Sequence, residues 1–502
     1  MPQALLAFDT DQIKRYVFAT SALREIRGAS ALLDHLNREV MPRQVLQADP
    51  TAETIFAHGG AGLFLVDATR AETARRAVAS AYRELTGGAA SVTGVVLALP
   101  DGFDPERSDL RPLQRLLQLR LRMAKDWPAE TAATLGLSHL RPCEACGEFP
   151  AADPERHPRG RAQSRLLCRA CQRRLAGHSG LRGRVASELP DAATWPESFA
   201  DLGKLSRPSS YIGLVYADGN GMGREIEALP TLQAVRDFAW AVDAAILEAT
   251  RAAIRAHLKP RNGCRPFDVL LLGGDDLVLV TSADAAIEVA LVVVEEFGRQ
   301  TEERLRRRLS LSTAVVLAHD HFPFRVLLDL AESALRFAKR EGARRNLEDP
   351  TLINFLTVTS SNHLDFETYY KEALHETHPG QLDEHLRTLR PYAPADLRHL
   401  VKTARKLKNA PRTKLHALGE CVFQSHTKSV MDGLTILHRW CAGHDRGPRV
   451  EEVRTLQELV SASAHGSMLF PWCAEALPPP GGCQWCTPLL DLVDLFEFVR
   501  EA

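Results

Sequence analysis

One short hairpin motif constrains the fold of this chain more than any other feature. Residues 267–280 read FDVLLLGGDDLVLV, so two apolar runs meet at Gly273, Gly274, Asp275 and Asp276. Apolar runs on either side of a glycine-containing turn predict two buried strands in a tight hairpin, because glycine adopts positive φ readily. Adjacent carboxylates at such a turn favour a hard cation such as Mg²⁺ or Mn²⁺. On its own, the motif is also consistent with an ordinary hairpin that has a polar tip.

Length and composition indicate a soluble protein of several domains. The chain has 502 residues, of which 45% are hydrophobic and 25% charged, with a formal net charge of -1. Such a length exceeds one hydrophobic core, so roughly two to four domains are expected. The net charge provides no global attraction for nucleic acid, which would need a local basic patch. Because no apolar run is long enough to span a membrane and no signal peptide is recognisable, we expect a cytoplasmic protein.

The hairpin lies in a segment, residues 205–358, with the element order of a ferredoxin-like domain. An apolar strand at 211–216 ends at Asp218, and a long helical pattern follows over about 231–258. After the hairpin, the periodicity predicts a helix, a strand, a helix and a strand. This β-α-β-β-α-β order with one added helix predicts an α+β fold, in which Asp218 and the hairpin aspartates lie at neighbouring strand ends.

The N-terminal segment, residues 1–130, repeats the same order of elements. Its first strand ends at Asp9, and Gly59-Gly60-Ala61-Gly62 takes the place of the hairpin turn. The last helices also agree, since Leu-Arg-Met-Ala-Lys ends at Lys125 and Leu-Arg-Phe-Ala-Lys ends at Lys339. An internal duplication explains this economically. Two unrelated α/β units with similar periodicity are the alternative.

The two copies differ at the turn. We expect Ala61 and Gly62 at the positions of Asp275 and Asp276, so that only the second copy carries the paired carboxylates. The second copy is therefore the candidate active one, and the first copy its inactive partner. An N-cap or turn role for Asp218 is the simpler alternative to metal binding.

Four cysteines between the two copies predict a zinc site. Cys143 and Cys146 form one Cys-x-x-Cys pair, Cys168 and Cys171 form another, and 21 residues separate the pairs. Two such pairs are typical of a structural Zn²⁺ site, because four thiolates leave no position for a substrate. We assign residues 131–200 to this zinc module and its linker. The module has a basic rim that either contacts RNA or a partner or is simply solvated: Arg159, Arg161, Arg165, Arg169, Arg173 and Arg174.

The remaining residues, 360–502, have a helical and amphipathic pattern interrupted by prolines. A basic run from Lys402 to Lys414 either follows a nucleic-acid backbone or forms a solvated face. A second zinc site is an open alternative, because metal-like spacing relates Cys441 to His444 and Cys483 to Cys486, with Cys473 between the pairs.

Together the motifs resemble the large polymerase/cyclase subunit of type III CRISPR–Cas effector complexes. The resemblance covers about residues 1–355. It implies two palm domains, at 1–130 and 205–358, with the zinc module between them and a C-terminal α-helical domain at 360–502. Four pieces carry it: FDTDQIKRYVF at 8–18 with LREIRGASALL at 23–33, YADGNGMG at 216–223, the Gly-Gly-Asp-Asp turn, and the four cysteines.

The resemblance implies a metal-dependent nucleotidyltransferase. In that family two palms face each other and bind two ATP molecules, and the active palm joins a 3′-oxygen to an α-phosphate, releasing pyrophosphate. The products are cyclic oligoadenylates that activate nucleases in phage defence. Other effector subunits and guide or target RNA are implied as partners, and self-association is possible. Larger members begin with an HD nuclease domain, which we expect this short form to lack because its first strand begins at residue 4.

The resemblance also assigns roles to individual residues. Asp218, Asp275 and Asp276 are the expected catalytic residues and ligands for Mg²⁺ or Mn²⁺, with ATP as the substrate. His58, beside the first turn, either contacts a base or is structural. The expected nucleotide-binding residues are Gly219, Asn220, Gly221, Gly223, Gly273, Gly274, Lys339, Arg27 and Ser30.

Two other functions compete with the cyclase. A catalytically silent RNA- or protein-binding scaffold would not need the three clustered carboxylates. A templated polymerase would need a channel for primer and template, which no part of the sequence indicates.

Overall fold

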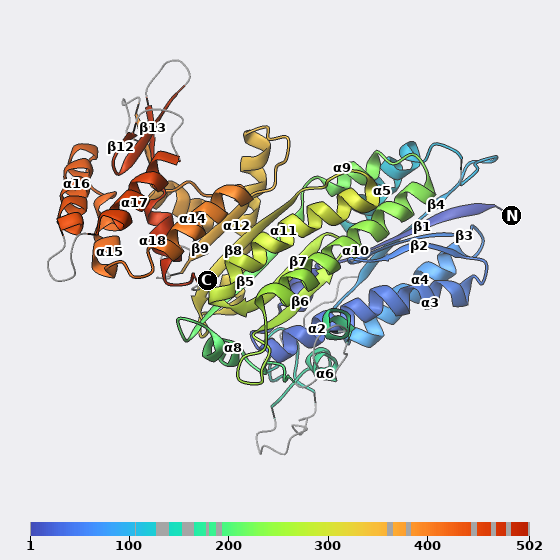
Figure 1. Ribbon diagram of the computed structural model, residues 1–502. Helices are drawn as coiled ribbons and strands as arrows, with labels where there is room; N and C mark the ends of the chain where they lie inside the picture. The colour runs from blue at the N-terminus through green and yellow to red at the C-terminus, as the bar shows by residue number, and fades with distance from the viewer. Residues whose placement is uncertain are drawn as a thin grey trace.

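The computed structural model describes residues 2–105, 107–126, 140–152, 165–176, 180–186, 193–358, 365–377, 383–442, 449–462, 468–477 and 483–499. Two sheet domains lie next to each other, the first in blue and the second in green to yellow, with a C-terminal domain in orange to red (Figure 1). Among the helices of the described residues, none combines the length and the apolar character needed to cross a membrane.

The first palm is a four-stranded antiparallel sheet in the order β2-β3-β1-β4. Its central strand is buried from Ala4 to Phe8 because helices cover both faces. Leu5 and Ala7 pack toward α5, whereas Leu6 and Phe8 pack toward α2 and α4. The elements are β1 (Gln3–Thr10), α1 (Ile13–Val17), α2 (Leu23–His35), a π-helical turn (Leu36–Val40), α3 (Met41–Ala48), β2 (Glu53–His58), β3 (Ala61–Asp67), α4 (Ala71–Thr86), β4 (Val92–Ala98) and α5 (Arg111–Asp126).

The second palm has the strand order β6-β7-β5-β8-β9, in which β9 is parallel to β8. Helices α10 and α11 pack on one face of this sheet, and α12 packs on the other. The elements are β5 (Tyr211–Gly219), α9 (Met222–Glu227), α10 (Leu232–His257), β6 (Phe267–Gly273), β7 (Asp276–Ser282), α11 (Ala283–Leu305), β8 (Leu311–His319), α12 (Phe324–Arg344) and β9 (Ile353–Thr357).

The structure confirms the duplication. In each copy, neighbouring strands across the sheet are the second, third, first and fourth strands along the chain: β2-β3-β1-β4 in the first palm and β6-β7-β5-β8 in the second. Among the described residues, only the second copy has a further strand, β9, after its last helix. Two unrelated units would have no reason to share this order.

The register of the two hairpins corrects one correspondence. In the first palm the ladder closes with His58 opposite Ala61, and in the second with Gly273 opposite Asp276. Ala61, not Gly62, therefore occupies the position of Asp276. The expected match was one residue out because it aligned Gly59-Gly60 with Gly273-Gly274. The first turn begins at Gly59, the first glycine of its pair, whereas the second turn begins at Gly274, the second glycine of its pair. The first palm still has no carboxylate at this turn.

Each palm packs one of its helices against an edge strand of the other palm. Helix α10 of the second palm contacts β2, the edge strand of the first, and α2 of the first palm contacts β6, the edge strand of the second (Figure 1). An uncovered edge strand offers unpaired backbone groups to other chains. Each copy thus covers the exposed edge of the other.

The tips of the two hairpins touch through glycine backbones. A Cβ placed on Gly59 would lie 2.9 Å from the nitrogen of Gly274, and one on Gly273 would lie 3.2 Å from the Cα of Gly59. Gly59 and Gly274 also have positive φ values of 63° and 64°. Any larger residue at Gly59 would push the turn that carries the two aspartates.

A buried ion-pair network, which we call the Asp243 clamp, joins the two palms and the linker helix α7 (Gly180–Ala186). Arg38 of the first palm lies 2.6 Å from Asp243 Oδ1, and Arg184 of α7 lies 3.4 Å from its Oδ2. Asp34 accepts hydrogen bonds from both arginines, at 2.8 and 3.2 Å. Two cations and two anions balance within the network, as burial of charge requires.

A second ion-pair network, which we call the Asp268 clamp, also joins the first palm, α7 and the second palm. It is centred on Asp268, near the start of β6. Asp268 is fully buried and lies 3.0 Å from Arg27 of the first palm and 2.8 Å from Arg182 of α7. The Arg182 guanidinium also stacks over Trp195, 4.3 Å from the ring centroid. Each clamp thus holds one carboxylate of the second palm between one arginine of the first palm and one of α7.

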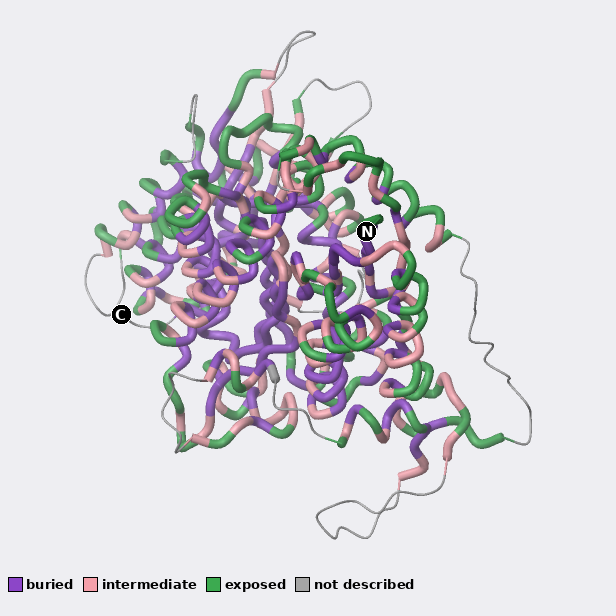
Figure 2. Tube along the Cα trace, turned by 90° about the vertical axis from the view of Figure 1, so that its right-hand side faces the viewer, coloured by how far each residue is buried: buried purple, intermediate pink, exposed green. Residues whose placement is uncertain are grey.

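The C-terminal domain shares a hydrophobic core with the second palm, since Leu397, Leu456 and Leu492 belong to the cluster that contains Val215 and Leu279. Figure 2 shows the buried parts of the chain mainly in the interior and the exposed parts mainly at the periphery. The other helices are α6 (Arg169–Leu175), α8 (Phe199–Leu205), α13 (Phe366–Tyr369) with a π-helical turn (Tyr370–Leu374), α14 (Pro394–Lys406), α15 (Arg412–Cys421), α16 (His426–Ala442), α17 (Val450–Ala462) and α18 (Leu489–Phe496).

The helices expected in the C-terminal domain are confirmed, and a small sheet accompanies them. Its order is β10-β11-β14-β13-β12. These strands are too short to give a periodic signal in the sequence, because alternation needs several residues to be recognised. They are β10 (His375–Thr377), β11 (Glu384–Leu386), β12 (Met468–Leu469), β13 (Trp472–Ala476) and β14 (Cys483–Cys486).

We predict that the palm interface loses stability in acid. Burial, together with Arg38 and Arg184, lowers the pKa of His58 from 6.5 to about 4, although Asp243 opposes the shift. The folded chain therefore binds fewer protons than the unfolded one, so stability present above pH 6.5 is lost as the pH falls toward 4. Between pH 8 and pH 5 the contribution of His58 to the unfolding free energy falls by about 2 kcal/mol.

Urea unfolding at the two pH values measures this loss. The variant His58→Gln should remove that part of the pH dependence, whereas His416→Gln, at an exposed position, should not. Equal pH dependence in the wild type and His58→Gln would contradict the assignment.

Candidate active site

The three predicted catalytic aspartates meet at one end of the second sheet. Ala217 pairs with Leu277 on the neighbouring strand, so Asp218 follows on β5 where Asp276 begins β7. Asp275 lies in the two-residue turn just before it. Its carboxylate reaches back over Gly219, where a Cβ would lie only 2.6 Å from Asp275 Oδ2. Gly219 is thus required by the close approach of this carboxylate.

The carboxylates repel one another in a partly buried setting. Burial, and then the charge of Asp218, raise the pKa of Asp275 to about 7. Burial and the charges of Asp218 and Asp275 likewise hold the pKa of Asp276 well above its ordinary value. The cations nearby only partly compensate. A cluster of this kind has the donor set for a divalent cation, which would neutralise it.

Lys339 lies at the site, as predicted. Its Nζ is 2.5 Å from Asp218 Oδ2 and 2.7 Å from the carbonyl oxygen of Gly219. The first palm has the matching pair, with Lys125 Nζ 2.7 Å from Asp9 Oδ2. The duplicated Leu-Arg-x-Ala-Lys helices therefore carry equivalent lysines to equivalent strand ends.

Ser30 borders the carboxylates from the first palm. A cavity of about 30 Å³ lies between the palms, where Ser30 and Asn37 face Gly273 and Asp276. The Ser30 hydroxyl is buried and makes no hydrogen bond among the described residues. It is therefore available to a ligand in this cavity.

Lys14 is a site residue that the sequence motifs did not single out. It lies in α1 of the first palm but reaches the second, with Nζ 3.1 Å from Glu332 Oε1 and 5.1 Å from the centroid of the Tyr216 ring. Its charge is one of those that lower the pKa of Asp276 against the effect of burial. The only signal for it was its place within the opening motif, 8–18.

Arg27 and Asn220 have other contacts. Arg27 is part of the Asp268 clamp, and Asp268 lies at the opposite end of β6 from the turn. The Asn220 side chain donates to Ser310 Oγ and to the carbonyl oxygen of Pro350, both at 3.2 Å, and accepts from Ser312. Asn220 therefore holds the loop after β5 against the strand β8 region.

The remaining glycines of the motif shape the same loop. Gly221 has a positive φ of 69° and immediately precedes α9, and Gly223 lies inside that helix. Gly273 and Gly274 form the contact with Gly59 described above. The structure therefore brings all of these glycines to the end of the sheet that carries the aspartates.

The four predicted zinc ligands form one cluster. The Sγ atoms of Cys143, Cys146, Cys168 and Cys171 all lie within 4.8 Å of one another. Four thiols at this spacing fit tetrahedral Zn²⁺. Arg159 and Arg161 of the basic rim, and His444 of the possible second site, lie outside the described residues. Cys473 and Cys486 pair on neighbouring strands with their Sγ atoms 3.1 Å apart.

The zinc module docks on the first palm at the Arg-Gly-Ala-Ser motif. A Cβ on Gly28 would lie 1.8 Å from the carbonyl oxygen of Arg174, so only glycine admits this contact. The buried Arg174 guanidinium donates to the carbonyl oxygen of Tyr16, 2.8 Å away, and stacks on the Tyr16 ring. Tyr16 and Lys14 share the short helix α1. The module therefore supports the helix that carries Lys14 to the second palm.

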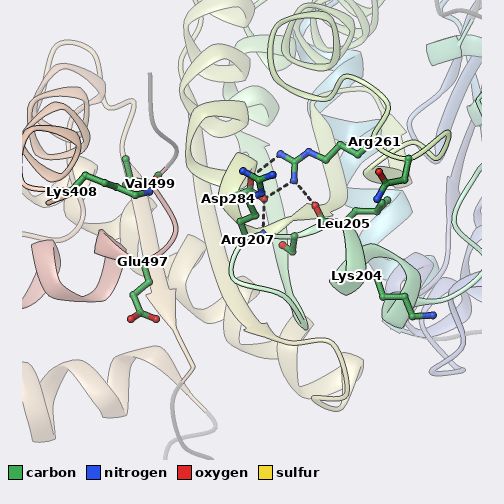
Figure 3. A pocket seen from close by; sticks show the side chains of 10 residues that line it. Lys204, Leu205, Arg207, Arg261, Asp284, Lys408, Glu497 and Val499 are labelled. Carbon is green, nitrogen blue, oxygen red and sulfur yellow. Dashed lines mark hydrogen bonds and ion pairs between the residues drawn. The ribbon is translucent and has the colours of Figure 1, made fainter.

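A larger cavity lies elsewhere, between the second palm and the C-terminal domain. Its volume is about 660 Å³, and Figure 3 shows Arg261 and Asp284 on one wall and Lys408 and Glu497 on the other. Arg261 is bound to Asp284 at 2.6 Å, and Lys408 donates to the carbonyl oxygen of Val499 at 2.6 Å. Several cations of the basic run from Lys402 to Lys414 are thus engaged within the protein.

Comparison with known proteins agrees with this site. The family described as Cas10/Cmr2, second palm domain, matches residues 211–348, which include all three aspartates and Lys339. Among curated proteins, none matches the sequence of this chain.

Solved structures share the fold. A chain in the crystal structure of the Csm1–Csm4 cassette with pppApA has 14% identity and a TM-score of 0.57, and the match covers 91% of this chain and 69% of that one. In the complex with cA3 the identity is 15%, the TM-score 0.57, and the coverage 99% and 70%. In the complex with AMPPNP the identity is 14%, the TM-score 0.57, and the coverage 99% and 70%.

At such identities the structural likeness establishes the common fold, and the family match adds the second palm. In fold and in its second palm, this chain therefore resembles the large subunit of type III CRISPR–Cas effector complexes, with residues 211–348 matching the Cas10/Cmr2 second palm domain.

Proposed function

We propose that this chain is a nucleotidyltransferase that joins ATP molecules into cyclic oligoadenylates in antiviral defence. The convergence of Asp218, Asp275 and Asp276 at one end of the second sheet is the observation that carries the proposal. Burial and then mutual repulsion raise the pKa values of Asp275 and Asp276, so three ionised carboxylates are costly here unless a cation binds. A scaffold without catalysis would gain nothing from this arrangement.

The three aspartates would hold Mg²⁺ or Mn²⁺. When bound, such ions lower the pKa of a substrate hydroxyl and stabilise the charge on phosphate oxygens. In the proposed reaction a 3′-oxygen forms a bond to the α-phosphorus of a second ATP, the bond from that phosphorus to the pyrophosphate oxygen breaks, and the hydroxyl proton passes to solvent. Catalysis of this kind depends mainly on positioning and charge neutralisation.

Residues of both palms would contact the nucleotide. Lys339 and Lys14 supply positive charge near the carboxylates, and the unpaired hydroxyl of Ser30 supplies a hydrogen bond from the first palm. The glycines at 219, 221 and 223 allow the backbone to approach a triphosphate. We assign Arg27 and Asn220 to holding the interface and the loop, so their contribution to nucleotide binding is indirect.

The comparisons support ATP as the substrate and a second subunit as a partner. The solved structures with the same fold are complexes of a Csm1–Csm4 cassette with AMPPNP, with a linear dinucleotide triphosphate and with cyclic triadenylate. By that likeness we propose that this chain binds adenine nucleotides and assembles with a Csm4-like subunit, and with guide and target RNA in a larger complex.

The first prediction concerns the hairpin aspartates. In Asp275→Ala/Asp276→Ala, the loss of two metal ligands should abolish oligoadenylate synthesis, by a factor of about 10³ or more. Purified protein is incubated with ATP and Mg²⁺ or Mn²⁺, and the products are read by mass spectrometry. Asp109→Ala, which removes an exposed surface ion pair, serves as the control and should retain activity.

Either of two results would contradict the cyclase. Synthesis that persists in the double variant would remove the catalytic role of the aspartates. Metal-independent ATP binding with no product under any condition, including in the presence of effector subunits and target RNA, would favour the silent scaffold.

A further prediction concerns zinc. We expect about one Zn²⁺ per chain, lost in Cys146→Ser/Cys171→Ser, with a clear fall in Tm because the metal stabilises the module that packs on Gly28 and Tyr16. Elemental analysis and thermal unfolding measure the two effects. Cys264→Ser, outside the cluster, should change neither, and retention of zinc in the double variant would contradict the site.

A further inference from the structure

The Asp243 clamp also makes hydrogen bonds to the backbone of the catalytic turn. Asp243 Oδ1 accepts a hydrogen bond from the backbone N–H of Gly274, at 3.1 Å. Arg184 donates to the carbonyl oxygen of Leu272, at 3.4 Å. The two bonds lie on either side of Gly273. The clamp thus holds the backbone from which Asp275 and Asp276 project.

The carboxylate of Asp243 is itself held in place by the other parts of the chain. It belongs to α10 of the second palm, but its partners Arg38 and Arg184 come from the first palm and from α7. Arg251 donates to the carbonyl oxygen of Arg184, at 2.6 and 3.1 Å, and so also fastens α7. The hydrogen bond to Gly274 therefore depends on docking of both neighbours.

The surroundings keep Asp243 ionised. Burial alone would raise its pKa, but His58, Arg38 and Arg184 outweigh burial and hold the pKa below the usual range. An ionised carboxylate makes a stronger bond to a backbone N–H than a neutral group does. The clamp therefore supplies a strong and permanent acceptor to the turn.

The Asp268 clamp likewise holds one carboxylate of the second palm between two arginines, but it does not touch the turn. Asp268 accepts from Arg27, Arg182 and the backbone N–H of Val269, all near the start of β6. It joins the same first palm, α7 and second palm. The two clamps therefore differ in one respect that an experiment can use, namely the hydrogen bond to Gly274.

We propose that Asp243 is a positioning residue: it fixes the Gly274 backbone so that Asp275 and Asp276 face Asp218, and it makes this geometry conditional on docking of the first palm and α7. The inference rests on the proposed function, since it concerns the same site. It gives the inactive first palm a structural role in catalysis, because Arg38 orients the carboxylate that orients the turn. The first palm, which has no carboxylate at its own turn, then remains necessary for the metal site.

The test compares Asp243→Ala with Asp268→Ala in the full chain. The first readout is hydrogen–deuterium exchange of peptides covering residues 272–279, which needs no metal. The second is Mn²⁺ affinity by electron paramagnetic resonance, with an ATP analogue bridged by methylene between the α- and β-phosphates. The conservative variants Asp243→Asn and Asp268→Asn are measured alongside, because either alanine variant could fail to fold.

We expect faster exchange of the turn in Asp243→Ala only. Mn²⁺ affinity should fall by about tenfold or more in that variant, as is typical when a group that orients a metal ligand is removed. Asp268→Ala should lower Tm comparably without either effect. Asp243→Asn keeps an acceptor oxygen for Gly274, so it should recover most of the Mn²⁺ affinity while remaining destabilised.

Two outcomes would overturn the inference. Equal effects of the two alanine variants on exchange and Mn²⁺ affinity, or a loss of Mn²⁺ affinity in Asp268→Asn, would show general loosening of the interface. Unchanged exchange and affinity in every Asp243 variant would show that the turn holds its own geometry. If the turn loosens only in Asp243→Ala but the wild type binds no Mn²⁺, the proposed metal site fails while the positioning role stands.

Discussion

Contact between two glycine turns is the constraint on which the rest of this structure depends. Gly59 of the first palm and Gly273 and Gly274 of the second approach so closely that a single Cβ would separate them. This contact sets the distance between the palms, and the packing of α2 on β6 and of α10 on β2 follows from it. The Asp243 and Asp268 clamps then place six arginine–carboxylate contacts in the same interface, which requires accurate pairing because unpaired buried charge is costly.

The two copies share the same arrangement of strands and helices but differ in the residues at their turns. Each palm carries an aspartate at the end of its central strand and a lysine from its last helix, 2.7 Å apart in the first copy and 2.5 Å in the second. Only the second adds carboxylates at the turn, and there burial and then mutual repulsion raise the pKa values of Asp275 and Asp276. The first palm contributes Lys14 and Ser30 from outside, so the site belongs to the interface rather than to one domain.

The zinc module supports this site by packing against the first palm and contributes no residue to the carboxylate cluster. Its four cysteines lie apart from the carboxylates, yet Arg174 fills the space beside Gly28 and holds Tyr16. Because Tyr16 and Lys14 lie on one short helix, the module helps determine where Lys14 points. A five-residue helix has little stability of its own and needs such support.

The sequence by itself determined the α+β class, the duplication, the cysteine cluster and the three aspartates, because each depends on local pattern: buried strands, a glycine turn, repeated spacing. It placed Lys339 correctly for the same reason. It could not place Arg27, which serves the Asp268 clamp, or reveal Lys14 and Asp243, since their partners lie far away along the chain. The turn correspondence was one residue out because register is decided by cross-strand pairing, which only the tertiary structure contains.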